Sequence, residues 1–157
     1  MRSLVLVAAL ALAACGGDGK SGESATTTAE AVAPSGPPQT VALAEGDQIQ
    51  HAASVSDVAQ LQSGAKIFST VGGDPAMNGL YTYIAVYGEA PDVAWRVFQI
   101  GDFNSWSVHE DRGNEVVLKI SRNWMDQSNG QIGTLEEYLI VTTPNATSTS
   151  VTVTPAQ

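Results

Sequence analysis

The chain of 157 residues has a single cysteine and only two histidines. One cysteine cannot form a disulfide within the chain, so the fold must rest on an ordinary hydrophobic core. The sequence also has no Gly-x-Ser-x-Gly elbow, no His-Glu-x-x-His motif and no Gly-rich phosphate loop followed by Lys-Ser or Lys-Thr. Both histidines, His51 and His109, are expected to be solvated loop residues. We therefore predict a protein that is not an enzyme and that carries no cofactor and no metal.

Basic residues are scarce as well. Lys and Arg number 7 against 16 Asp and Glu, which gives a formal net charge of −9. A chain without a basic stripe has little with which to displace the counterions of phosphates, so nucleic acid is excluded as a partner. An anionic membrane surface is expected to repel such a domain for the same reason.

The chain also lacks an apolar run long enough to span a membrane, which takes about 18 residues or more. Its one long apolar run covers residues 4–14, follows Arg2 and ends in Ala13-Ala14. A positive start, a short apolar stretch and small residues at the end are typical of a secretory signal peptide. Directly after the run come Cys15 and the Gly-rich residues 16–19. Residues 1–14 are therefore predicted to be a leader that is removed.

The sequence Leu12-Ala13-Ala14-Cys15, followed by glycines, resembles the lipobox of bacterial lipoproteins. The resemblance implies that the Cys15 sulfur carries a diacylglycerol, that the chain is cut before Cys15 and that the new amino terminus is acylated, commonly with palmitate. Each buried CH₂ group contributes about 0.8 kcal/mol, so two or three acyl chains hold a protein almost permanently. In similar lipoproteins an Asp after the cysteine favours the inner membrane; Gly16 stands there, so we expect the outer membrane of the cell envelope, in contact with the periplasm. The alternative is an ordinary signal peptide with a free cysteine.

Residues 15–45 are rich in Gly, Ser, Thr, Ala and Pro and contain no aromatic residue. They show neither helical nor alternating apolar periodicity, which predicts a disordered tether. A coil of this length reaches about 30 Å. Because the Debye length is about 8 Å at physiological salt, such a tether would hold the acidic domain clear of the bilayer.

Residues 46–157 are predicted to form one all-β domain, a small antiparallel β-sandwich or barrel. Residues 55–61 are compatible with one short helix or with a strand. Residues 123–133 read as a polar loop, and residues 147–154 as an edge strand. Further strands are expected over 66–71, 80–87, 93–100, 106–108, 115–122 and 136–143. The clearest alternation places Val116, Leu118 and Ile120 on one buried face.

All ten aromatic residues lie between Phe68 and Tyr138. Tyr81, Tyr83 and Tyr87 share one face of a predicted strand, with Trp95 on the next strand. These rings are candidates for a platform that binds a glycan or a partner protein, because Tyr and Trp combine broad apolar faces with polar tips. The alternative is that the same rings form half of a two-layer core.

Trp106 and Trp124 stand at predicted turns among polar neighbours, so both are candidates for exposed contacts. Residues 126–130, Asp-Gln-Ser-Asn-Gly, superficially resemble a calcium loop but lack the Glu at the twelfth position, so a plain Asn-Gly turn is the better interpretation. The acidic pairs 110–111 and 136–137 are adjacent, which points their side chains to opposite faces of a strand.

We therefore expect a lipid-anchored envelope lipoprotein whose β-domain binds or assists an envelope protein or a glycan. Two alternatives remain: an inhibitor or immunity-type lipoprotein that acts through its acidic surface, and a small envelope hydrolase. A one-sided acidic face would favour the inhibitor, and two carboxylates about 5 to 9.5 Å apart beside exposed aromatics would favour the hydrolase.

Overall fold

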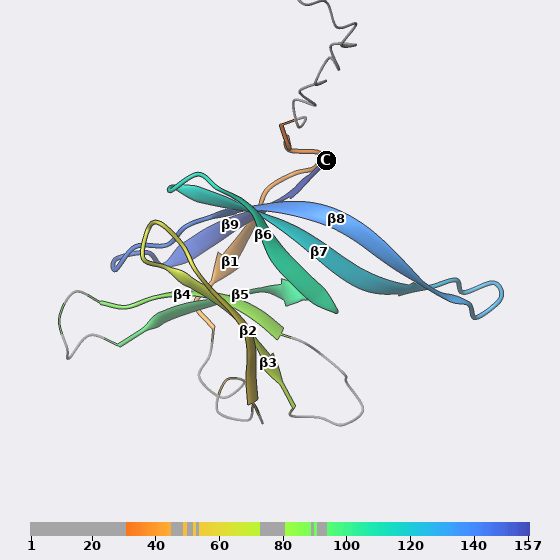
Figure 1. Cartoon of the computed structure of the whole chain (residues 1–157), viewed down its shortest axis with the longest axis horizontal. Helices are drawn as coiled ribbons and strands as arrows, with labels where there is room; N and C mark the ends of the chain where they lie inside the picture. The colour runs from red at the N-terminus through yellow and green to blue at the C-terminus, as the bar shows by residue number, and fades with distance from the viewer. Residues whose placement is uncertain are drawn as a thin grey trace, which may run out of the picture. The chain divides into compact units, whose positions relative to one another are not determined.

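The computed structural model describes residues 31–44, 49, 52, 54–72, 81–88, 90 and 94–157. The nine elements that these residues form are all β-strands, arranged in two antiparallel sheets (Figure 1). The all-β prediction is confirmed, and of the two predicted architectures the structure has the sandwich. The predicted leader, Cys15 and the first half of the predicted tether lie outside the described residues.

One sheet has five strands, in the order β1-β9-β8-β7-β6. Their bounds are β1 Gln39–Ala42, β6 Ser105–Asp111, β7 Glu115–Met125, β8 Ile132–Thr142 and β9 Ser150–Ala156. The other sheet has four strands in sequence order: β2 Ser54–Gln60, β3 Lys66–Val71, β4 Tyr81–Val86 and β5 Arg96–Asp102.

The main core lies between the sheets and is built from alternate residues of their inner faces. The predicted period of two in β7 is confirmed, because Val116, Leu118 and Ile120 are all almost completely buried. The other inward residues of this core include Ile67, Ile84, Phe98, Ile100, Phe103, Leu139, Val141, Val151 and Val153.

The segment that was compatible with a helix or a strand is β2, which pairs with β3. A register shift between Ser56 and Ala59, with Asp57 at a φ of 48°, interrupts the alternation of its side chains. Val55 and Val58 are 59% and 65% exposed, so the apolar face that a helix would have buried has nothing to pack against. The irregular spacing that suggested a helix is therefore a β-bulge.

The prediction of a disordered tether as far as residue 45 is wrong for residues 31–44. Gln39–Ala42 form β1 and pair with β9, Val32 is buried, and Pro34 bridges Ala156. The compact unit accordingly begins at Ala31 rather than at residue 46. A strand can form here despite the polar composition because β9 offers an unpaired edge with buried valines that needs cover.

The residues after β1 connect the two sheets at one side. Leu43 bridges Phe98 of β5, and the backbone N–H of Ala44 donates to the carbonyl of Val97 at 2.7 Å. One continuous segment thus pairs first with the five-stranded sheet and then with the four-stranded one.

Two other expectations are corrected. The predicted edge strand at residues 147–154 is β9, an interior strand, because β1 covers its outer side. The predicted polar loop at residues 123–133 is mostly strand, because the pairing of β7 with β8 continues to Met125 opposite Ile132. Only residues 126–131 form the turn between them.

Candidate functional site

The outer half of the β7–β8 hairpin extends beyond the rest of the sheet. Within the described residues, the pairing of β6 with β7 ends at Ser121, and the pairing of β9 with β8 ends at Tyr138. Residues 122–137 therefore continue as a two-stranded ribbon, named here the hairpin arm. Figure 1 shows β7 and β8 running out past the ends of the other strands.

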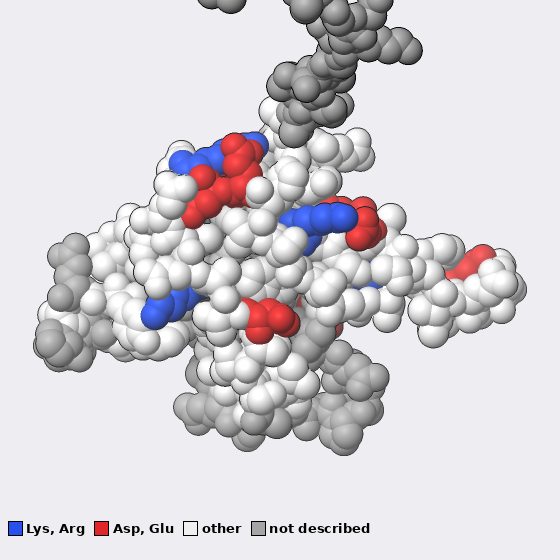
Figure 2. Space-filling view, viewed as in Figure 1, with Lys and Arg blue, Asp and Glu red and all other residues white. Residues whose placement is uncertain are grey.

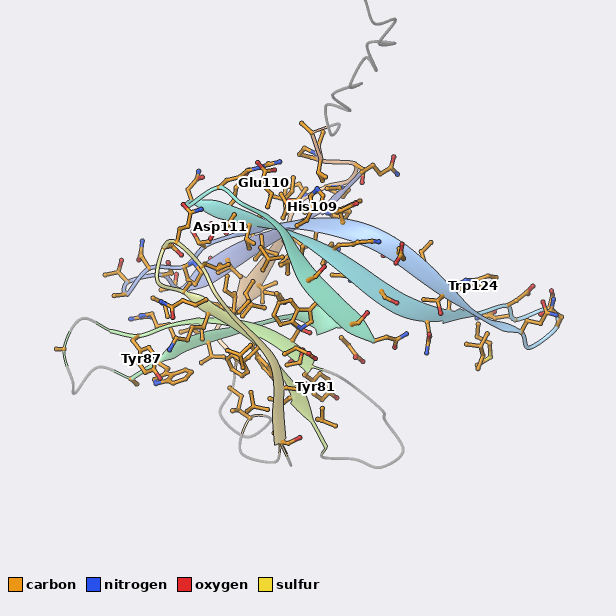
Figure 3. The ribbon with its side chains drawn as sticks, viewed as in Figure 1. Tyr81, Tyr87, His109, Glu110, Asp111 and Trp124 are labelled. Atoms are coloured by element: carbon orange, nitrogen blue, oxygen red, sulfur yellow. The ribbon has the colours of Figure 1, made fainter. Side chains whose placement is uncertain are left out.

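The hairpin arm carries four exposed apolar side chains. Trp124 is 51% exposed, Met125 63%, Ile132 69% and Leu135 47%. By the register of the hairpin, Trp124 and Leu135 lie on the face that continues the core, whereas Met125 and Ile132 lie on the opposite face. Figure 3 shows Trp124 on the arm, away from the body of the domain. Apolar side chains exposed together in this way are typical of an interaction surface.

The turn at the end of the arm is closed by its own hydrogen bonds. Asp126 Oδ1 accepts from the backbone N–H of Ser128 at 2.8 Å and from its hydroxyl at 2.6 Å. These hydrogen bonds lower the pKa of Asp126. Gly130 takes a φ of +70°, which a glycine adopts without strain. The loop that superficially resembled a calcium site is an Asn-Gly turn, and no cluster of three or more His, Cys, Asp or Glu side chains suited to a metal occurs among the described residues.

A cleft of about 590 Å³ lies at the base of the arm. Its apolar lining comes from both sheets and includes Val41, Ile100 and Val153. Arg122 and Glu137 supply charge at the arm side of the cleft, with 3.9 Å between Arg122 Nε and Glu137 Oε2. The cleft is therefore amphipathic. Through Arg122 and Leu135 it reaches the face of the arm that carries Trp124.

Arg122 is held at this place by a second contact. Its guanidinium lies 4.9 Å from the centroid of the Phe103 ring. Phe103 is only 1% exposed, so a fixed aromatic ring supports a cation whose own side chain remains 45% exposed. The ion pair with Glu137 is long, which leaves guanidinium donors free to face a ligand in the cleft.

The four residues of the predicted aromatic platform do not form one exposed surface. They share the outer face of the four-stranded sheet, but Tyr83 is completely buried and Tyr81 partly buried. Ala44 and Ile49 pack on this face beside Phe68 and complete a second small core. Burial raises the pKa of the Tyr83 hydroxyl. For Tyr83 the core alternative is therefore the correct one.

Tyr87 and Trp95 are the exposed part of this face, at 48% and 46%. Their ring centroids are 4.2 Å apart in an edge-to-face arrangement, and Trp95 also contacts the edge of Phe68 at 6.4 Å. Lys66 Nζ lies 5.2 Å from the Tyr87 ring centroid. These two rings remain candidates for contact with a ligand, on a surface separate from the hairpin arm.

The prediction that Trp106 makes exposed contacts is wrong. Trp106 is partly buried against the main core, and its indole Nε1–H donates to Ser69 Oγ on the other sheet at 2.6 Å. The polar neighbours of Trp106 in the sequence suggested exposure. The sequence does not show that the facing sheet covers this side chain. Of the two turn tryptophans, only Trp124 is exposed.

The acidic residues beside His109 serve the fold (Figure 3). Asp111 accepts from the backbone N–H of Gln62 at 2.6 Å and from that of Gly113 at 3.0 Å, which links a turn of each sheet. Glu110 pairs with Arg112 at 2.7 Å, and this hydrogen-bonded pair lowers the pKa of Glu110.

Four of the eight acidic side chains that the structure describes have a basic partner nearby. Arg112 also contacts Glu115 at 2.7 Å, and Lys119 contacts Glu136 at 2.8 Å. Figure 2 shows basic and acidic side chains side by side in two places on the visible face. The visible face is therefore not uniformly acidic.

No protein family, curated protein or solved structure matches this chain. Within the described residues, no helix is long and apolar enough to cross a bilayer.

Proposed function

We propose that this chain is a lipid-anchored envelope lipoprotein whose β-domain is a non-enzymatic binding module. The hairpin arm is the observation that supports binding. It holds a tryptophan and three aliphatic or thioether side chains in solvent, beside an amphipathic cleft. Trp and Met are enriched at protein interfaces, and Trp is one of the residues that most often dominate the free energy of association.

The two alternatives have less support among the described residues. An inhibitor acting through acidic charge would need carboxylates free to meet a partner, but Glu110 and Glu115 both pair with Arg112. For a hydrolase, the carboxylates beside His109 are not available to a substrate, because both oxygens of Asp111 accept from backbone amides and Glu110 is paired with Arg112.

The anchor is tested by replacing the cysteine. We expect Cys15→Ser to leave an uncleaved precursor without lipid, because the thiol is the only group in the chain to which the diacylglycerol of a lipobox can be attached. Mass spectrometry and labelling with radioactive palmitate measure the result. A Cys15→Ser chain that is still labelled and normally processed would contradict the lipobox. Sucrose-gradient fractionation of the unaltered protein distinguishes the proposed outer membrane from the inner membrane.

The binding surface is tested by photo-crosslinking in cells. A photoreactive phenylalanine analogue at position 132 is expected to capture one envelope component, because this side chain is the most exposed of the four on the arm. The matched control carries the analogue at Val58, an equally exposed position on the four-stranded sheet. Equal, non-specific capture at both positions would argue against the arm as the binding surface.

A further inference from the structure

One edge of the hairpin arm is an unpaired strand edge. β8 has 11 residues, but its pairing with β9 covers only Tyr138 to Val141. Within the described residues, 132–137 pair with β7 on one side and with no strand on the other. The backbone N–H and C=O groups that point outward there are therefore available to another chain.

The sequence of this edge lacks three common protections against strand addition, namely proline, lysine and a β-bulge. Residues 132–137 read Ile-Gly-Thr-Leu-Glu-Glu, without proline or lysine. The pairing of β7 with β8 is continuous along this stretch, so no bulge turns the edge away. Gly133 has no side chain to keep an approaching backbone at a distance.

The cleft lies beside this same edge. Leu135, Glu136 and Glu137 line it, together with Pro155 and Gln157 at the end of β9. A strand added to 132–137 would run end to end with β9, in the place that β9 leaves open. Its alternate side chains would then face the apolar part of the cleft.

Charge indicates which kind of chain fits. Glu136 points to the face of the edge opposite to that of Leu135, and its side chain is 66% exposed although it also contacts Lys119 at 2.8 Å. The whole protein carries a net charge of −9, so a second copy would bring like charge to this surface. A segment with basic residues is attracted to the same place.

We infer that the β8 edge of the hairpin arm binds an extended segment of a partner protein by strand addition. The segment alternates apolar side chains, which enter the cleft, with Lys or Arg side chains, which point to the opposite face of the sheet and meet Glu136 there. This inference rests on the proposed binding function and specifies how the partner is recognised.

The test uses the full-length lipoprotein in detergent and a fluorescent peptide, Lys-Val-Lys-Val-Lys-Val-Lys, followed by anisotropy. A second peptide has the same side chains but an N-methyl group on every backbone amide. We expect it to bind at least about tenfold more weakly, because it cannot donate the backbone hydrogen bonds of a β-ladder. Equal affinities would overturn strand addition, since side-chain charge alone would then explain binding.

Protein variants locate the peptide. Glu136→Gln is expected to weaken binding of the unmodified peptide several-fold, and Leu135→Lys to weaken it further by placing a like charge on the edge. Glu110→Gln is the matched control, because Glu110 is likewise an exposed carboxylate paired with a basic side chain but lies away from the arm. Equal losses in the control and the arm variants would overturn the assignment.

The remaining outcomes separate this inference from the proposed function. If position 132 captures an envelope partner but the unmodified peptide does not bind, strand addition fails and the binding module stands. If sedimentation shows a dimer that Leu135→Lys disrupts, the occupant is a second copy and the inference fails. If the peptide binds as expected but position 132 captures nothing in cells, recognition by the β8 edge stands and the envelope function fails.

Discussion

Gly101 and Gly133 both lie against aromatic rings, but an added methyl group is expected to change the free energy of unfolding by different amounts at the two positions. A Cβ at Gly101 would overlap the ring of Phe103, and a Cβ at Gly133 would overlap the indole of Trp124. Phe103 is fixed in the core at 1% exposure, whereas Trp124 is half exposed and free to swing outward. The same substitution therefore tests whether each ring is held in place.

We expect Gly101→Ala to lower the free energy of unfolding by about 1 to 3 kcal/mol, the usual cost of forcing extra volume into a packed core. Gly133→Ala is expected to change it by less than about 0.5 kcal/mol, the range of most surface substitutions. Urea unfolding measures both, and Trp fluorescence reports the displaced indole. Equal losses would mean that Trp124 is as firmly packed as Phe103.

The two tryptophans of the turns can be distinguished by the same substitution, Trp→Phe, which removes the indole N–H together with part of the ring. Trp106→Phe removes the indole donor that bonds Ser69 Oγ and is expected to cost about 0.5 to 1.5 kcal/mol. Trp124→Phe removes no hydrogen bond found among the described residues and is expected to be nearly neutral to stability. Thermal unfolding of the two variants provides the measurement; a larger loss for Trp124→Phe would contradict the exposed position of Trp124.

At the level of elements, the segment from Ala31 to Ala44 is held by contacts at both its ends. Arg112 Nη2 donates to the carbonyl of Val32 at 3.1 Å, and Ala33 exchanges two backbone hydrogen bonds of 2.9 Å with Gln157. β1 then covers the outer side of β9. Without this segment, β9 would become an exposed edge.

We expect a chain that begins at Ala31 to be more stable than one that begins at Ile49. The shorter chain loses β1 and the burial of Val32 and Val41, which contributes about 2 kcal/mol or more. The urea midpoints of the two truncated proteins compare their stabilities. Mixing the two proteins tests whether the exposed β9 edge of the shorter one causes aggregation. Identical midpoints would show that residues 31–48 add nothing to the domain.

For the whole molecule, two exposed carboxylates with lowered pKa values predict how the stability of the fold depends on pH. The Arg112 guanidinium holds the pKa of Glu110 below its usual value, and Ser128 does the same for Asp126. A carboxyl whose pKa is lower in the folded state stabilises the fold above its unfolded pKa, near 4 to 4.5. That stabilisation is lost as the pH falls through the lowered folded values.

We therefore expect the melting temperature to be constant from pH 7 to about pH 5 and to fall below it. In Glu110→Gln the acid-induced fall should be shallower, because one of the two shifted carboxyls is gone. Calorimetry at pH 7, 5, 4 and 3 measures the profile. A Glu110→Gln profile as steep as that of the unaltered protein would show that this pair does not contribute.

The fold class and the central strands were predictable because alternation is a local property. The pattern of Val116, Leu118 and Ile120 is visible in six residues, and β3 has the predicted bounds. The hairpin arm was missed because Asn123 and the polar turn outweigh the few apolar residues that flank them. Trp124 was selected as a contact residue from its polar neighbours, and its exposure agrees with that choice, although the same reasoning was wrong for Trp106.

By itself, the sequence determined the short apolar run that ends before Cys15, the acidic balance and the alternating strands of an all-β domain, since each can be read from the chain without knowing which residues meet in space. Only the tertiary structure decided that residues 39–42 are a strand, that β9 is interior and that Tyr83 is core. Each of these depends on a partner far along the chain, as when Gln39 meets Val153. Burial depends on which residues lie opposite in space, and the local sequence pattern does not identify those residues.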